Sequence, residues 1–242
     1  DREDGERLLE LAEESSPKST GLLLRLIRVH AAIGNTAAAS RLLDEAAGMV
    51  SEDLEEKMLW AETLDLMGRH EAAIAVYSEL VSERPQDGEL INDLANCYYR
   101  SERFAEAEEQ YLRALAADMP PAVAYRNLGL ARARMGKVDE AITSLEHYLQ
   151  LNPDAVEITH VVADLYARVE RFSEAIGCYE RVLRANPQDA GALFGLAECY
   201  LHMGHKDSAI LGYRRVLELD ENFEPAAERL RELAGTSVGD RG

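Results

Sequence analysis

The chain has 242 residues, 47% of them apolar, and a formal net charge of −19. So negative a charge argues against nucleic-acid binding as the main task, and no apolar run approaches the ~18 residues that a membrane helix needs. The acidic, amphipathic start, DREDGERLLEL, is unlike a signal peptide. We therefore expect no membrane insertion and a cytoplasmic location, with a periplasmic or other piece of a longer protein as the alternative.

The three cysteines are Cys97, Cys178 and Cys199. They form neither an even set nor a Cys-x-x-Cys pair, which favours reduced, buried thiols.

A period of 34 residues runs through the chain. It is set by a small residue that recurs six times without an insertion, at Ala39, Ala73, Ala107, Ala141, Ala175 and Ala209. Apolar residues recur in step, thirteen residues before each alanine and four and seven residues after it. A fixed period of this length is typical of stacked helical repeats.

Each period predicts two helices. In the third period, apolar residues spaced three and four apart run from Ile91 to Tyr98 and then from Phe104 to Leu115. Glycines that suit a left-handed helix C-terminus stand between the halves, at Gly34, Gly68, Gly136 and Gly204. Neither helix can bury its apolar stripe alone, so neighbouring units must stack. The pattern predicts an all-α protein built from antiparallel helix pairs.

The stretch 124–155, AYRNLGLARARMGKVDEAITSLEHYLQLNPDA, resembles the tetratricopeptide repeat (TPR) family. The matching residues are Leu128, Gly129, Gly136, Ala141, Tyr148 and Pro153. The resemblance covers residues 20–223 and implies a right-handed superhelical solenoid.

In chain order, residues 1–17 are expected to form the second helix of a truncated preceding repeat, which makes the chain a piece of a longer protein. Six TPR units are expected at 20–53, 54–87, 88–121, 122–155, 156–189 and 190–223. Residues 224–234 are expected to form a polar capping helix, and residues 235–242 a disordered tail.

The resemblance also implies a binding surface, because in TPR superhelices the first helix of each unit lines the concave face. The groove positions lie 15, 14, 11, 8 and 7 residues before the repeat alanine. On this basis the expected peptide-binding residues are Asn92, Asn96, Tyr99, Arg100, Arg126, Asn127, Leu130, Arg134, His160, Asp164, Arg168, Phe194, Glu198 and His202. The same positions in the first three units also hold Arg28, Glu62, Asp65, Leu66 and Asp93.

Three of these residues, Arg100, Arg134 and Arg168, repeat at intervals of 34. Two interpretations stay open. The three arginines form a row that binds an acidic ligand, or their positive charges complement the helix dipole at the helix C-termini. Asp164 stands four residues before Arg168 and offers it a surface ion pair, whereas Arg100 and Arg134 have no acidic residue at that spacing.

Asn96 and Asn127 match two positions of the carboxylate clamp by which chaperone-binding TPR domains hold the C-terminus of an acidic peptide. The first lysine position of the clamp holds Asn92, and its two further basic positions hold Glu157 and Val161. A carboxylate needs charge-assisted donors, so the clamp is not expected. The two asparagines are expected instead to bind the backbone of an extended peptide.

No catalytic motif, cofactor or metal site is expected. Cys199, His202 and His205 are of residue types that ligate metals, but Gly204 breaks the helix between the two histidines. This favours histidines at the surface of a helix end. The expected function is therefore a non-catalytic scaffold for protein–protein interaction that holds an extended or short helical, acidic peptide.

Two alternatives stay open. One is a substrate-recruiting or regulatory arm of a larger enzyme such as a glycosyltransferase. The other is self-association through the repeat ends, as in scaffolds of bacterial organelles or envelope machines.

Overall fold

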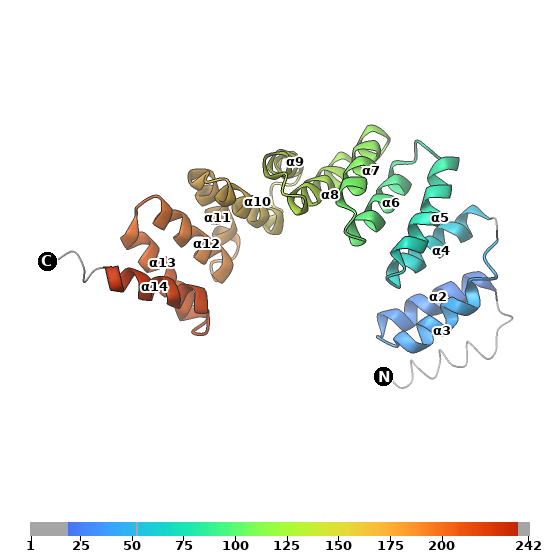
Figure 1. Ribbon diagram of the computed structural model, residues 1–242, viewed down its shortest axis with the longest axis horizontal. Helices are drawn as coiled ribbons and strands as arrows, with labels where there is room; N and C mark the ends of the chain where they lie inside the picture. Colours follow the sequence, from blue (N-terminus) through green and yellow to red (C-terminus); the bar gives the residue numbers. More distant parts are fainter. Residues whose placement is uncertain (1–18, 52, 237–242) are drawn as a thin grey trace. The chain divides into compact units, whose positions relative to one another are not determined.

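The structure is a computed structural model that describes residues 19–51 and 53–236. In this part of the chain, every regular element is a helix (Figure 1). The helices are α2 Thr20–Ala32, α3 Thr36–Ala46, α4 Leu54–Leu66, α5 His70–Glu83, α6 Gly88–Arg100, α7 Phe104–Ala116, α8 Pro121–Arg134, α9 Val138–Leu151, α10 Val156–Arg168, α11 Phe172–Ala185, α12 Ala190–His202, α13 Lys206–Leu219 and α14 Glu224–Thr236. The helix expected over 1–17 lies outside the described residues. The tail was expected over 235–242, but α14 continues to Thr236, and the rest of the expected tail lies outside the described residues.

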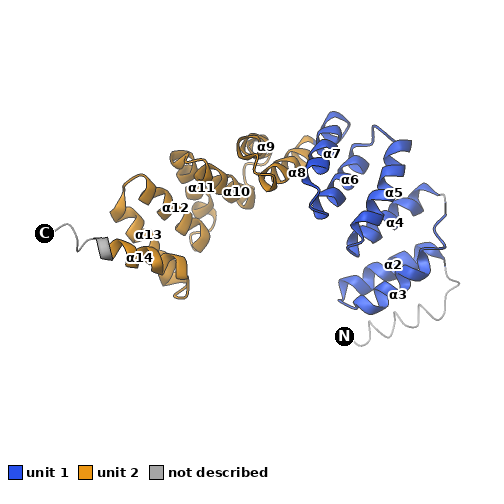
Figure 2. Ribbon diagram, in the orientation of Figure 1, with its two compact units in different colours: residues 1–120 blue, residues 121–242 orange. Residues whose placement is uncertain are grey.

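The chain divides into two compact units, residues 1–120 and 121–242 (Figure 2). Unit 1 contains the helix pairs α2/α3, α4/α5 and α6/α7. Unit 2 contains the pairs α8/α9, α10/α11 and α12/α13, followed by α14, which packs on α13. Successive pairs pack on one another within each unit, as α5 does on α6 and α11 on α12. The prediction of an all-α stack of helix pairs is confirmed.

The turns between the two helices of a pair use a left-handed residue. Gly34, Gly68, Gly136 and Gly204 have φ of +78°, +71°, +75° and +82°, which confirms the prediction made from their spacing. The other two pairs place Glu102 and Glu170 at this position, with φ of +59° and +60°. A side chain in this conformation costs about 1–2 kcal/mol, because its Cβ crowds the following carbonyl.

The residue after each of these two glutamates holds the turn against the first helix. Arg103 and Arg171 lie over the rings of Tyr98 and Tyr166, with 4.6 and 4.5 Å between guanidinium carbon and ring centroid. Contacts of this kind contribute about 0.5–1 kcal/mol at exposed sites and offset part of the turn's cost.

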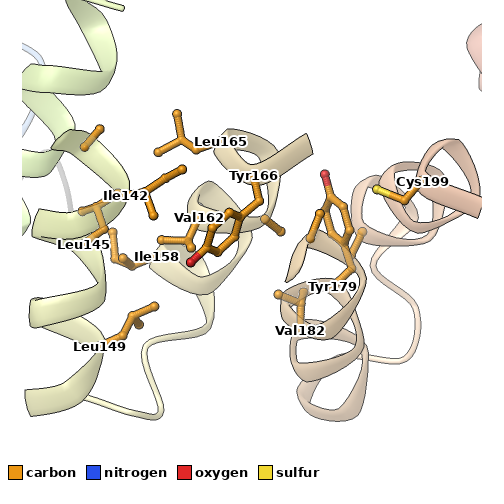
Figure 3. Close-up of a cluster of buried hydrophobic side chains, with 14 residues drawn as sticks. Ile142, Leu145, Leu149, Ile158, Val162, Leu165, Tyr166, Tyr179, Val182 and Cys199 are labelled. Atoms are coloured by element: carbon orange, nitrogen blue, oxygen red, sulfur yellow. The ribbon is translucent and has the colours of Figure 1, made fainter. Parts of the chain in front are cut away.

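The core of each unit is built from the repeat alanines and the apolar faces around them. All six repeat alanines have no exposed surface, as expected where two helices cross closely. Figure 3 shows one cluster in unit 2, in which Leu145 of α9 lies near Ile158 and Val162 of α10.

The cysteines divide by burial. Cys97 and Cys199 are buried, and burial raises the pKa of both thiols, that of Cys199 to about 11. The prediction is wrong for Cys178, which is only partly buried because it lines a surface groove with Glu146 and Arg181. A raised pKa makes a thiol a poor nucleophile at neutral pH.

In the described residues, no helix combines the length and the apolar character that crossing a bilayer would require.

Candidate peptide-binding groove

The first helices of unit 1 line a pocket of about 660 Å³. We call this cavity the unit 1 pocket, and its lining residues are Arg28, Glu62, Asp65, Leu66, Gly68, His70, Tyr77, Asp93, Asn96 and Arg100. Most of them occupy the groove positions that the TPR resemblance implies. Helices α2, α4 and α6 supply these side chains, and α5 supplies His70 and Tyr77.

Ion pairs join successive repeats across this pocket. Nη1 of Arg28 lies 2.9 Å from Oε2 of Glu62, and Arg100 forms an ion pair with Asp65. Asp65 also lies 2.8 Å from Nδ1 of His70. The charge of Arg100 is therefore balanced by a carboxylate of the preceding repeat. The spacing within one helix does not predict this pair, because Asp65 is 35 residues away from Arg100 and lies on another helix.

Asp93 is the pocket carboxylate that has no ion-pair partner within the described residues. Burial raises its pKa to about 6, and the nearby carboxylates of Glu62 and Asp65 add to this effect. The side-chain amide of Asn92 lowers the pKa in part through a hydrogen bond. The local environment therefore disfavours ionisation of the Asp93 carboxyl group.

A tyrosine hydroxyl fixes the central groove side chain in three of the repeats. The tyrosine lies four residues after the repeat alanine and donates to the residue eleven before that alanine; we call this contact the crossbar. Tyr111 donates to Asn96 at 2.8 Å, Tyr179 to Asp164 at 2.6 Å, and Tyr213 to Glu198.

The fourth repeat has an apolar version of the crossbar. There Leu145 replaces the tyrosine, and Leu130 stands at the groove position, partly buried against the cluster that contains Leu145. Leu130 is therefore better described as the edge of the core than as an open groove residue.

Asn92 is buried, unlike most of the expected groove residues. Only 6% of it is exposed, because it shares a face of α6 with the buried residues Gly88 and Ala95. Asn127, in contrast, is half-buried on α8.

The groove of unit 2 exposes unbalanced arginines. Arg126 and Arg168 are exposed, and neither forms an ion pair with another described residue. The expected pair of Arg168 with Asp164 is not formed, since Asp164 instead accepts from Tyr179 and lies 3.8 Å from Nε2 of His160. Arg134 is exposed at the last residue of α8.

The C-terminal end of the groove is closed by α14. Nε and Nη2 of Arg229 each lie 2.9 Å from an oxygen of Glu198, in a bidentate pair that leaves 20% of the Glu198 side chain exposed. The ring of Phe194 packs against Tyr213 and Phe223, at 5.7 and 5.3 Å between centroids. Glu198 and Phe194 therefore hold the capping helix, which their sequence positions alone did not indicate.

Aromatic contacts engage the remaining expected residues. Tyr99 meets Phe104 edge-on at 5.3 Å. The exposed ring of His202 stacks on Phe172 at 4.8 Å, whereas Cys199 lies in the interior.

The comparisons with known proteins agree with this fold. The chain is 27% identical over 172 residues to BBSome complex member BBS4 of Bos taurus, a match that covers 69% of the chain and 33% of that protein. It is 31% identical over 93 residues to RNA polymerase II-associated protein 3 of Mus musculus, which covers 38% of the chain and 14% of that protein.

A similar solved structure is that of YrrB, described as a TPR protein with an unusual peptide-binding site. Its TM-score is 0.69 at 18% identity, over 78% of this chain and 97% of that one. A family model for the C-terminal domain of cilia and flagella-associated protein 70 matches residues 3–236. The chain has a TPR fold and belongs to the family of the cilia and flagella-associated protein 70 C-terminal domain.

Proposed function

We propose that the chain is a non-catalytic scaffold that holds an extended or short helical segment of a partner protein along the first helices of its repeats. The observation that carries this proposal is the crossbar, in which a buried tyrosine fixes the groove side chain of Asn96 or Asp164. Side chains held in place before a ligand arrives lose less conformational entropy on binding. A polar groove fixed in this way favours binding as its role.

The family match supports a place for this scaffold in cilia or flagella. The likeness to BBS4, whose name makes it a member of the BBSome complex, supports a role within a multi-protein assembly. Self-association through the repeat ends and attachment to a larger enzyme stay predictions.

Within unit 2, we propose that Arg126 and Arg168 bind acidic or phosphorylated side chains of the partner. Both are exposed and lack an ion pair among the described residues, so an acidic ligand would not have to displace a carboxylate first. Arg100 is different, because Asp65 already balances its charge. We therefore assign Arg100 to the architecture of the unit 1 pocket.

The test is partner capture from ciliated cells, comparing the chain with the double variant Arg126→Glu/Arg168→Glu. Each exposed charge contact contributes about 0.5–1 kcal/mol to binding. Reversal of both arginine charges should therefore weaken the binding of a genuine partner about tenfold. The matched control is Arg184→Glu/Arg214→Glu, which makes the same charge change at exposed arginines of the second helices α11 and α13. Quantitative mass spectrometry of the captured proteins is the measurement.

We expect the groove variant to lose proteins that the control variant retains. Equal capture by both variants would show that Arg126 and Arg168 do not contribute to partner binding. If neither variant nor the unaltered chain enriches any ciliary protein over a bait-free resin, the scaffold proposal itself is wrong.

A further inference from the structure

The unit 1 pocket contains an unequal number of positive and negative side chains. Its acidic residues are Glu62, Asp65 and Asp93, and its arginines are Arg28 and Arg100. The two arginines pair with Glu62 and Asp65. Asp93 is the third acidic side chain, and neither arginine of the pocket pairs with it.

The position of Asp93 makes its negative charge costly. Its carboxyl group is half-buried, and it shares the cavity with the carboxylates of Glu62 and Asp65. Burial and these neighbours together raise its pKa to about 6. At neutral pH the group still ionises, so the folded protein holds a partly desolvated carboxylate that has no ion-pair partner in the described part of the chain. An incoming cation would stabilise it.

The cavity is also large enough for a ligand group. Its volume of about 660 Å³ lies within the range of small-ligand sites, roughly 300–1,000 Å³. An acidic group entering it would meet three carboxylates, while both arginines are already engaged. The charge arrangement therefore favours a cation and disfavours an anion.

We propose that the unit 1 pocket binds a lysine or arginine side chain of the partner segment, whose ammonium or guanidinium group pairs directly with Asp93. Glu62 and Asp65 add attraction across the cavity while they stay paired with Arg28 and Arg100. This proposal rests on the proposed function, since it assumes that a partner segment lies along the first helices. It gives the groove two chemical preferences: a basic side chain at the unit 1 pocket and acidic side chains beside the exposed arginines of unit 2.

The experiment uses the full chain and a blocked peptide, acetyl-Gly-Ser-Lys-Ser-Gly-amide, at constant ionic strength. The matched probe replaces lysine by norleucine, which keeps the aliphatic stem and removes the charge. NMR follows the backbone amides of α4 and α6 and the titration of the Asp93 carboxyl carbon. We expect the lysine peptide to shift these amides and, at saturation, to lower the pKa of Asp93 by at least one pH unit. One pH unit corresponds to roughly tenfold tighter binding to the ionised carboxylate.

Two variants separate the pocket from long-range charge. Asp93→Asn should weaken the lysine peptide about tenfold, because it removes the charge that the ammonium pairs with. Glu89→Gln removes the same charge four residues earlier on α6, at an exposed position outside the pocket lining, and should leave binding nearly unchanged.

Three results would overturn the proposal: no amide shift with the lysine peptide, equal shifts with the norleucine peptide, or equal losses in the two variants. Any of these combined with intact partner capture would reject the cation pocket and leave the scaffold standing. Failed capture alongside a clear lysine response would reject the scaffold and leave the pocket as a cation site.

Discussion

Asp93 lies on α6 with its carboxyl group half-buried in the unit 1 pocket. Its pKa of about 6 in the folded chain is above the ordinary value of 3.8. The folded state therefore holds this proton more tightly than the unfolded state does. Its contribution to stability is most favourable below about pH 4, falls as the pH rises to about 6, and is constant above that.

We predict that Asp93→Asn stabilises the chain at pH 7.5. The full pKa difference corresponds to about 3 kcal/mol, and solvent access to the pocket reduces the expected gain to about 1 kcal/mol. The charged and titratable groups that surround Asp93 are Arg28, Glu62, Asp65, His70, Tyr77, Glu89, Cys97 and Arg100. Urea unfolding of chain and variant should give curves that agree near pH 4 and separate by pH 6.5. Parallel curves across this range would contradict the raised pKa.

The turn between paired helices keeps one backbone geometry with two kinds of residue. Four turns place glycine at the left-handed position, and two place Glu102 or Glu170 there. Both choices give the same backbone conformation, so the helix pair and not the turn residue imposes it. The two glutamate turns store strain that the packing of the pair outweighs.

We predict that Glu170→Gly raises the free energy of unfolding by about 0.5–1 kcal/mol. Glycine relieves the left-handed penalty of about 1–2 kcal/mol and loses part of that gain to its greater freedom in the unfolded chain. The reciprocal change, Gly136→Ala, should lower the free energy of unfolding by about 1 kcal/mol at the equivalent turn. A Cβ at Gly136 would meet open space, so the cost comes only from the left-handed backbone conformation. Thermal unfolding measures both, and a stabilising Gly136→Ala would show that φ does not govern this position.

Sequence reasoning succeeded where the interaction is local or repeats with the period. The helix pairs and the glycine turns follow from spacings within one unit. The interaction of Arg100 with Asp65 could not be predicted in this way. The pair depends on how closely α4 and α6 approach, and no spacing within one helix reveals that distance. The docking of Glu198 on α14 could not be predicted for the same reason. The burial of Asn92, in contrast, follows from its spacing to Gly88 and Ala95 on one face of α6.

At the scale of the whole molecule, unit 2 has its own hydrophobic interior. In unit 2, one buried cluster runs from Ala141 to Cys199, and a second joins Tyr213 and Val216 to Ala226 of α14. In repeat proteins, stability is close to a sum over repeats and their nearest-neighbour interfaces. A fragment that keeps these clusters and the capping helix should therefore remain folded.

We predict that residues 121–242, produced alone, keep a helical circular dichroism spectrum and a cooperative thermal transition. A fragment that begins at residue 138 removes α8, which packs on α9, and should melt at a lower temperature. A non-cooperative transition for 121–242 would mean that unit 2 depends on residues outside it.

The crossbar has a consequence for the evolution of the sequences in this family. A tyrosine at one of its two positions requires a hydrogen-bond acceptor at the other, as in Tyr179 with Asp164, whereas the leucine of the fourth repeat is matched by Leu130. A single replacement at either position would leave a buried hydroxyl without an acceptor or a carboxylate without its donor. In the third to sixth repeats the two positions, fifteen residues apart, should therefore covary in an alignment of related chains. The first repeat departs from this pattern, because its Leu43 stands opposite Arg28.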